Sequence, residues 1–337
     1  MAGPLIRIEG LRVAFDGAPA VRGVDFAIHR GEALGIVGES GSGKSVTWLA
    51  ALRLLPEKAV VEGRVSLDDE NLLEAPIGAI EHLRGGRVAM IFQDPASALN
   101  PVLTIRRQLG EALALHRGLS GRSIDAEAKR LLELVGIPDA AGRLKSYPHE
   151  MSGGQNQRVM IAMALAGNPD LLIADEPTTA LDVTIQAQIL DLLQLVRRET
   201  NMALVLISHD LGVVAENCDR VAVMYAGRVV EEAPARELFD APRHPYTRGL
   251  IDALPTLDAP RRLVAIPGVV PDPRRMPTGC AFSPRCAHAA PACLGEMPQL
   301  RRMEPGRRIA CARAAELDLQ PVAAVLPAET ARSEVTA

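Results

Sequence analysis

Short apolar runs alternate with amphipathic stretches over residues 5–235. Runs of four to six mostly apolar residues are typical of strands buried on both faces of a sheet. They occur at 33–37, 87–92, 171–174 and 203–207. Residues 184–198, which lie between the last two runs, have the spacing of an amphipathic helix. Strands that alternate with helices predict an α/β fold, in which helices wrap a parallel sheet.

Two other regions modify this plan. Residues 6–13, 24–28 and 60–67 indicate further short strands near the N-terminus. Apolar residues at helical spacing follow from Thr104 to about Leu134. We therefore expect a helical subdomain, over about residues 100–165, to be inserted into the α/β domain.

The composition changes after residue 254. Prolines punctuate a stretch that lacks long periodic elements, and they stand at positions 255, 260, 267, 271, 273 and 277. The change predicts a first domain over residues 1–254 and a loop-rich, cysteine-containing C-terminal extension over residues 255–320. The Ala-rich residues 321–337 are expected to form a disordered tail.

Length and charge limit the classes of function. The chain has 337 residues, a net charge of −4 and a pI near 6.0, which gives no case for binding nucleic acid. No apolar stretch approaches the roughly 18 to 20 residues that cross a bilayer. The N-terminus lacks the basic region and long apolar core of a secretory signal. A cytosolic protein is the default expectation, with membrane association only through a partner.

Residues 38–45 fit the phosphate-loop pattern G-x-x-x-x-G-K-[ST] without a mismatch. They lie between the apolar run 33–37 and a helix expected at 46–52, and this context disfavours a glycine-rich turn without a ligand. Backbone N–H groups would curl around a polyphosphate, Lys44 would reach the β- and γ-phosphates, and Ser45 would ligate Mg²⁺. The expected nucleotide-binding residues of this loop are Ser40, Gly41, Ser42, Gly43, Lys44, Ser45 and Thr47.

Two carboxylates close the apolar run 171–174. Asp175 and Glu176 stand where a parallel sheet presents side chains to its ligand crevice. Asp175 would hold Mg²⁺, directly or through water, and Glu176 is placed to polarise the attacking water as a general base. The phosphate loop favours this interpretation over a simple acidic turn before Pro177.

A Ser-Gly-Gly turn opens the helix expected from about residue 155 to 166. It predicts a second anion-binding helix N-terminus. One chain does not need two such sites for one nucleotide, so we expect this site to face the nucleotide held by another subunit. The residues concerned are Ser152, Gly153, Gly154 and Gln155.

The order of these motifs resembles the nucleotide-binding subunit of an ATP-binding cassette (ABC) transporter. The resemblance spans most of residues 5–235 and includes three further motifs, Gln93, residues 179–182 and His209. It implies a P-loop NTPase fold and ATP hydrolysis coupled to solute movement. The signature motif of the family corresponds here to residues 151–155. It begins with Met151 where Leu is usual, and Asn156, which follows it, replaces a common Arg. Neither change removes the Ser-Gly-Gly turn, so contact with ATP is expected to survive.

The resemblance also implies roles for individual residues. Gln93 would contact Mg²⁺ and act with the catalytic group, and it would relay the nucleotide state to membrane subunits. His209 matches the histidine that hydrogen-bonds the γ-phosphate, and Asp182 would belong to the nucleotide site. Phe15 falls where the family stacks an aromatic ring on adenine, and a place in the hydrophobic core is the alternative.

Four of the five cysteines crowd into the last fifth of the chain. In a reducing cytosol such a cluster favours metal or iron–sulfur ligation over disulfides. Four thiolates suit a 4Fe-4S cluster or a tetrahedral zinc ion, and the absence of C-x-x-C pairs disfavours zinc. Free thiols are the third interpretation. The four residues are Cys280, Cys286, Cys293 and Cys311, whereas Cys218 is expected to be a small buried apolar residue.

Residues 243–250 and 279–286 resemble the C-terminal extension of oligopeptide and dipeptide importer ATPases, some of which hold a 4Fe-4S cluster on a matching cysteine set. The resemblance implies an ATPase that powers the uptake of di- and oligopeptides at the cytoplasmic face of the bacterial inner membrane. The implied partners are a second ATPase subunit in a heterodimer, two transmembrane permease subunits and, indirectly, a periplasmic or lipoprotein solute-binding protein.

Other functions stay open at this point. The same type of ATPase serves importers of nickel, glutathione or another small solute. A soluble ABC protein of DNA repair or translation would have two cassettes in one chain or a long coiled-coil insertion, and neither is evident. A regulatory module that binds ATP without turnover is disfavoured because Glu176 and His209 are both intact.

Overall fold

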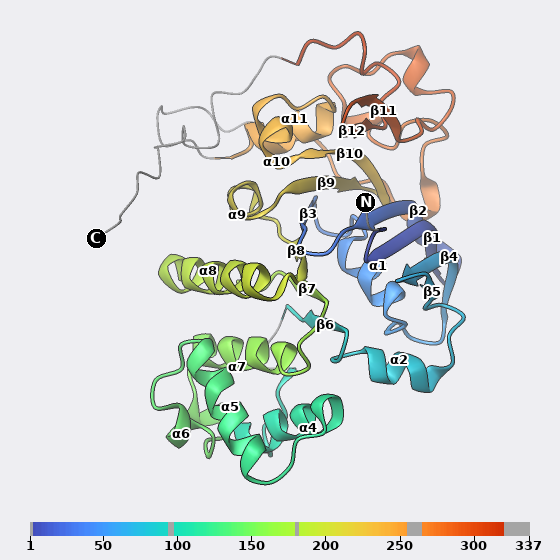
Figure 1. Cartoon of the computed structure of the whole chain (residues 1–337). Helices are drawn as coiled ribbons and strands as arrows, with labels where there is room; N and C mark the ends of the chain where they lie inside the picture. The colour runs from blue at the N-terminus through green and yellow to red at the C-terminus, as the bar shows by residue number, and fades with distance from the viewer. Residues whose placement is uncertain (1–2, 94–97, 179–181, 255–264, 320–337) are drawn as a thin grey trace.

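The computed structural model describes residues 3–93, 98–178, 182–254 and 265–319. In these residues the larger sheet has eight strands in the order β11-β12-β10-β9-β3-β8-β7-β6 (Figure 1). The strands are β3 (Ala33–Val37), β6 (Val88–Ile91), β7 (Leu171–Asp175), β8 (Ala203–Ile207), β9 (Arg220–Tyr225), β10 (Arg228–Pro234), β11 (Arg301–Glu304) and β12 (Arg307–Ile309). Neighbours from β9 to β6 run parallel, and β10, β12 and β11 add an antiparallel edge. The predicted parallel sheet is confirmed.

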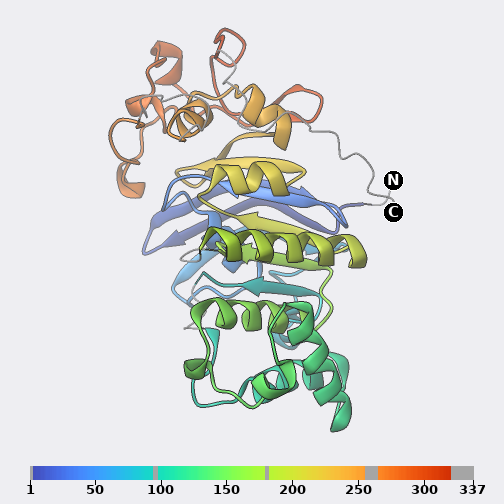
Figure 2. The same cartoon turned by 90° about the vertical axis from the view of Figure 1, so that its left-hand side faces the viewer.

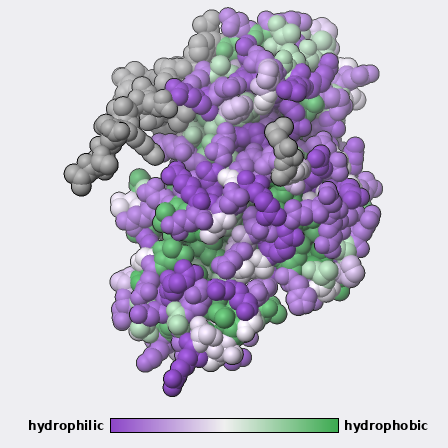
Figure 3. Space-filling model, in the orientation of Figure 1, coloured by the Kyte–Doolittle hydropathy of each residue, from purple (hydrophilic) through white to green (hydrophobic). Residues whose placement is uncertain are grey.

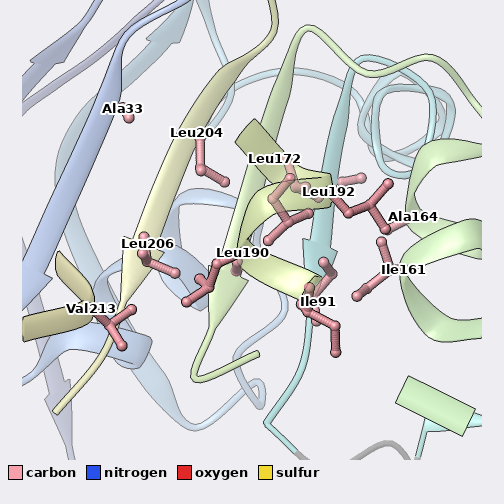
Figure 4. Close-up of a cluster of buried hydrophobic side chains, with 14 of the residues drawn as sticks. Ala33, Ile91, Ile161, Ala164, Leu172, Leu190, Leu192, Leu204, Leu206 and Val213 are labelled. Atoms are coloured by element: carbon pink, nitrogen blue, oxygen red, sulfur yellow. The ribbon is translucent and has the colours of Figure 1, made fainter. Parts of the chain in front are cut away.

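Helices cover one face of this sheet. The helices α7 (Gly153–Leu165), α8 (Val183–Thr200) and α9 (Leu211–Asn217) lie on the same side of the strands (Figure 2). Strand side chains alternate between the two faces, so Leu204 and Leu206 of β8 enter the helix-side core while Val205 enters the opposite one. Figure 4 shows part of the helix-side core, with side chains from the sheet and from α7, α8 and α9 gathered together.

A smaller sheet and the helix that follows β3 cover much of the other face. The strands β1 (Ile6–Phe15), β2 (Ala18–Ile28), β4 (Ala59–Leu67) and β5 (Glu70–Asn71) form an antiparallel sheet in the order β2-β1-β4-β5. Helix α1 (Lys44–Ala51) packs against β1 and β2. The core between this face of the large sheet and the smaller sheet is called the second core below. Trp48 of α1 is fully buried in it and stacks on Phe26, with ring centroids 6.1 Å apart. Burying this helix between two sheets fixes the phosphate loop that precedes it.

The helical subdomain lies below the large sheet in Figure 1. After α2 (Ile77–Leu83), it contains α4 (Ile105–Arg117), α5 (Arg122–Leu134), α6 (Ala140–Arg143) and α7. Thr104 caps α4 by accepting a hydrogen bond from the Arg107 N–H, and Gly118 ends that helix at a φ of +64°. Leu109 and Leu113 of α4 are fully buried, as their spacing predicts.

The C-terminal extension is attached to the large sheet. After α10 (Ala235–Asp240) and α11 (Pro245–Asp252), its described residues form short 3₁₀ turns and the strands β11 and β12. Strand β12 pairs with β10, with Glu231 opposite Ile309 and Glu232 opposite Arg308. The loop-rich character matches the sequence analysis, but the extension continues the sheet of the first domain instead of lying apart from it. The predicted tail, residues 321–337, is outside the described residues.

The surface of the face in Figure 3 is mostly hydrophilic, with smaller hydrophobic patches at the height of α7 and α8. Val183 and Leu195 of α8 are among the exposed large apolar residues. Across the described ranges, we find no helix with both the length and the apolar character needed to span a membrane.

Candidate nucleotide site and cysteine cavity

The phosphate loop connects β3 to α1. Gly43 precedes the first residue of α1, and no side chain caps this helix N-terminus. Gly41 has a φ of +77°, and a Cβ added to it would meet no atom within 4 Å, so the space above the loop is open. An uncapped helix N-terminus beneath open space fits a phosphate group. The loop therefore has the local geometry that its sequence predicts.

Lys44 lies over its own loop. Its Nζ donates hydrogen bonds to the carbonyl oxygens of Gly38, at 2.7 Å, and Glu39, at 3.1 Å. Burial lowers the pKa of Lys44, and the carboxylates of Glu176 and Asp175 oppose that shift. The ammonium group thus lies near carbonyl oxygens and carboxylates. An incoming phosphate could replace the carbonyl oxygens as its hydrogen-bond partner.

Two predicted loop residues support the loop from within. Thr47 is fully buried, and its hydroxyl donates to the carbonyl oxygen of Gly43 at 2.8 Å. Ser42 is 1 % exposed, and its N–H donates to the carbonyl oxygen of Glu39 at 3.2 Å. These contacts hold the shape of the loop, whereas Ser40 and Gly41 are on its more exposed side.

Ser45 and Asp175 are brought together from α1 and β7. The Ser45 hydroxyl donates a hydrogen bond to the Asp175 carboxylate, and Asp175 is 7 % exposed. Burial raises the pKa of Asp175 because it removes water from the charged form. A buried carboxylate beside a hydroxyl is a set of oxygen donors that suits Mg²⁺, so these residues fit the predicted ion.

Glu176 follows β7 in a left-handed backbone conformation, with a φ of +49°. Positive φ is uncommon for a residue with a side chain, and such strain gathers at functional sites. The Glu176 Oε2 atom accepts a 2.8 Å hydrogen bond from Gln93 Nε2 and lies 3.3 Å from His209 Nδ1. The ends of β6, β7 and β8 thus bring together the three residues that were predicted to act in catalysis.

The signature residues open α7 in the helical subdomain (Figure 1). The Ser152 hydroxyl accepts from the Gln155 N–H at 3.3 Å, and the Gln155 side-chain oxygen accepts from the Ser152 N–H at 3.1 Å. This reciprocal capping box stabilises the helix start. Gly153 and Ser152 are exposed, and Gly154 is half-buried. An exposed, glycine-rich helix start is accessible to a group from outside the chain.

The remaining predicted nucleotide residues lie at element ends. Phe15 ends β1, is half-buried, and packs at the edge of the second core. Asp182 caps α8 by accepting from the Ile185 N–H at 3.0 Å. Its neighbours 179–181 in the Thr-Ala-Leu-Asp motif are outside the described residues. Neither placement tests the contacts with ATP that the family resemblance implies.

The four clustered cysteines line one small, apolar cavity. Cys280, Cys286, Cys293 and Cys311 face it together with His244, Phe282 and neighbouring residues. Burial raises the pKa of the Cys280 and Cys286 thiols, and that of Cys311 to about 11. No group of three or more His, Cys, Asp or Glu side chains in the described ranges is arranged to hold a metal. The four thiols thus line one cavity, but they are not arranged in this structure as the ligands of a 4Fe-4S cluster or of another metal.

Sequence reasoning missed three residues that join the C-terminal part of the chain to the phosphate loop, namely Glu39, Tyr246 and Arg285. Arg285 makes a two-pronged ion pair with Glu39, and the Tyr246 hydroxyl accepts from the Glu39 N–H at 2.9 Å. Glu39 occupies a variable position of the phosphate-loop pattern, so the motif assigns it no role. Tyr246 and Arg285 fall inside the two C-terminal segments noted for their family resemblance, which was the available signal.

The fold and the site define a P-loop ATPase with an inserted helical subdomain. A family model described as "ABC transporter" matches residues 21–179. A second, described as "Oligopeptide/dipeptide transporter, C-terminal region", matches residues 230–293.

Two curated relatives match nearly the whole chain. A Brucella abortus (strain 2308) protein, named as a peptide import ATP-binding protein, is 51 % identical over 314 residues, which cover 91 % of this chain and 94 % of the relative. The oligopeptide transport ATP-binding protein OppD of Salmonella typhimurium is 48 % identical over 320 residues, which cover 94 % of this chain and 95 % of OppD.

Solved structures agree with the fold. The dimeric, post-hydrolysis structure of the ATP-binding cassette MJ0796 with ADP and Pi has a TM-score of 0.62 and 28 % identity, covering 68 % of this chain and 99 % of that chain. The structure of cbiO1 from Clostridium perfringens has a TM-score of 0.61 and 28 % identity, covering 71 % and 91 %. This chain belongs to the ABC transporter family, as an ATP-binding subunit with the C-terminal region of the oligopeptide/dipeptide group. It is an ATP-hydrolysing enzyme.

Proposed function

We propose that this ATPase powers the uptake of di- and oligopeptides through a binding-protein-dependent ABC importer. The observation that carries the proposal is the combination of the cassette with a matching oligopeptide/dipeptide C-terminal region in one chain. Relatives at 48 % and 51 % identity, which are named for peptide transport or import, support peptides as the solute.

The site residues divide the work of hydrolysis. Glu176 takes the proton of the attacking water. Gln93 and His209 lie within 3.3 Å of the Glu176 carboxylate and orient that carboxylate. Lys44 and the loop N–H groups bind the phosphates, and Ser45 and Asp175 hold Mg²⁺, with Gln93 as a further ligand. Mg²⁺ supplies charge neutralisation to the phosphates when bound.

A second cassette completes the enzyme. Ser152, Gly153, Gly154 and Gln155 face the nucleotide of the partner cassette, and the exposure of this helix start supports that role. The family often pairs two different cassettes, so we infer a heterodimer at the cytoplasmic face of the bacterial inner membrane. Two permease subunits form the path for the solute, and a periplasmic or lipoprotein binding protein delivers it.

Uptake by reconstituted vesicles tests the proposed solute. The complete importer, with its cognate binding protein, is placed in proteoliposomes that contain ATP, and uptake of a radiolabelled dipeptide and an oligopeptide is compared with that of nickel and glutathione. ATP-dependent uptake of a peptide is the expected result. Uptake of nickel or glutathione alone would show the same type of ATPase with another solute. A chain that copurifies with no membrane subunit would contradict a role in transport.

We also propose that the cysteine cavity holds a 4Fe-4S cluster. Four thiols that line one cavity supply the donor atoms that such a cluster takes. Because burial raises the pKa of Cys280, Cys286 and Cys311, ligation must displace their protons, and the thiols must also rearrange around the metal. A bound cluster would cross-link a segment that has little regular structure. We further propose that the first domain ends at residue 254 and that the C-terminal extension ends at residue 320.

A further inference from the structure

A buried arginine of the C-terminal extension reaches the phosphate loop. The Arg285 side chain is 4 % exposed, and its Nη1 and Nη2 atoms lie 2.6 and 2.9 Å from the two carboxylate oxygens of Glu39. Its Nε atom donates to the carbonyl oxygen of Pro267 at 2.8 Å, which fixes the guanidinium from behind. Such two-pronged, charge-assisted pairs are strong and specific in geometry.

An aromatic cluster holds the same contact from a second side. Tyr246 of α11 is fully buried, and its hydroxyl accepts the backbone N–H of Glu39. The Tyr246 ring lies 4.6 Å from the Tyr225 ring and 5.3 Å from that of Phe282, measured between centroids. Arg285 therefore holds the side chain of Glu39, and Tyr246 holds its backbone N–H. Both residues lie in the C-terminal part of the chain.

Glu39 in turn contacts the residues that shape the loop. Its carbonyl oxygen accepts from Lys44 Nζ and from the Ser42 N–H. Its carboxylate would repel a polyphosphate bound to the same loop, because like charges at short range disfavour each other. The positive charge of Arg285 neutralises that carboxylate, and the ion pair raises the pKa of Arg285, so the guanidinium stays charged.

We propose that Arg285 is a positioning residue for ATP, which acts through Glu39. By neutralising and orienting Glu39, with support from Tyr246, it keeps the phosphate loop ready to bind nucleotide. The nucleotide affinity of this subunit then depends on its C-terminal extension. The inference rests on the proposed role of the phosphate loop, and it gives the extension a function in the ATP site besides any metal that its cysteines hold.

Calorimetric titration of the full-length chain with Mg²⁺ and the non-hydrolysable analogue AMP-PNP tests this inference. Arg285→Met keeps part of the unbranched apolar stem and removes the guanidinium with its charge, and we expect the affinity to fall at least about fivefold, the lower end of coupling between sites. Adding Glu39→Gln to that variant removes the unpaired negative charge and should restore most of the affinity. A purely structural role for Arg285 predicts no such rescue.

Matched variants separate the possible outcomes. Arg313→Met removes another arginine of the extension, which pairs with Glu316 and has no contact with the loop, and it should leave the affinity unchanged. Lys44→Ala is the positive control, and normal binding by that variant would refute the phosphate site itself. If Arg285→Met does not fold, Tyr246→Phe removes only the hydroxyl and should weaken binding in the same direction.

Steady-state kinetics of the assembled importer give a second readout. Arg285→Met should raise the KM for ATP and leave kcat nearly unchanged, because it alters binding of the nucleotide and not the water-activating residues. An unchanged affinity in both Arg285→Met and Tyr246→Phe would overturn the proposal. So would a loss of affinity in Arg285→Met that Glu39→Gln does not relieve.

Discussion

Gln93 Nε2 donates a 2.8 Å hydrogen bond to Oε2 of Glu176, which joins the end of β6 to the end of β7. Gln93 comes directly before a segment that leads to the helical subdomain, and Glu176 is the proposed general base. Any movement of the Gln93 backbone therefore changes the environment of the base. This hydrogen bond gives the proposed relay between nucleotide and membrane subunits a physical starting point.

Gln93→Ala should uncouple transport from hydrolysis. The methyl side chain cannot hold Glu176 or follow a bound Mg²⁺, so peptide uptake per ATP hydrolysed should fall more than nucleotide affinity does. Uptake and phosphate release measured in the same proteoliposomes give this ratio. Full solute uptake by the variant would refute the relay.

Lys44→Ala should weaken nucleotide binding itself. The variant loses a charge-assisted contact to the phosphates, an interaction about twice as strong as a neutral hydrogen bond. Titration of the full-length chain with MgATP measures the effect. An affinity equal to that of the wild type would contradict the role of Lys44.

Asp175→Asn should raise the thermal stability of the nucleotide-free protein at neutral pH. Burial raises the pKa of Asp175, so the folded state favours the neutral carboxyl. That contribution to stability is present below the ordinary pKa of an aspartate and is lost as the pH rises through the folded-state pKa. The amide avoids the loss, and each kcal/mol gained raises Tm by roughly 1 to 2 °C in a chain of 337 residues, because the unfolding entropy grows with chain length.

Calorimetric scans across a range of pH, without Mg²⁺ or nucleotide, check this prediction. The difference in Tm between Asp175→Asn and the wild type should shrink as the pH falls into the acidic range. With MgATP present the order should reverse, since the variant loses a Mg²⁺ ligand. A variant that is less stable than the wild type at neutral pH without ligands would show that burial does not destabilise the charged form of Asp175 in the folded protein.

Protein purified without oxygen should contain about four irons per chain and absorb broadly near roughly 400 nm, as thiolate-ligated iron–sulfur clusters do. Replacing Cys286 with Ser should lower the iron content and loosen residues 265–312. Stoichiometric zinc without iron would falsify the cluster and leave a structural zinc site. Protein with neither metal would leave four free thiols.

The sequence predicts the centre of the fold well because local pattern and tertiary packing agree there. The runs that became β3, β7 and β8 are apolar on both faces, and each is buried in the sheet as expected. The phosphate loop and the carboxylates at the end of β7 follow from the same strands. Asp175 and Glu176 could therefore be placed at the site before any geometry was known.

The contacts of the C-terminal extension could not be predicted in this way. All four residues of β11 are exposed, so their pattern gives no strand signal, and pairing with β12 fixes their conformation. Arg285 and Glu39 lie 246 positions apart in sequence. Folding nevertheless brings Arg285, the residue before Cys286, onto the phosphate loop.

The most direct test of this account is ATP turnover by the assembled importer with Glu176→Gln. The amide cannot accept the proton of the attacking water, and loss of a general base typically slows a reaction by about a hundred- to ten-thousand-fold. We expect hydrolysis to fall within that range while MgATP still binds and holds the two cassettes together. Turnover at the wild-type rate would contradict the assignment of Glu176, and with it the proposed mechanism.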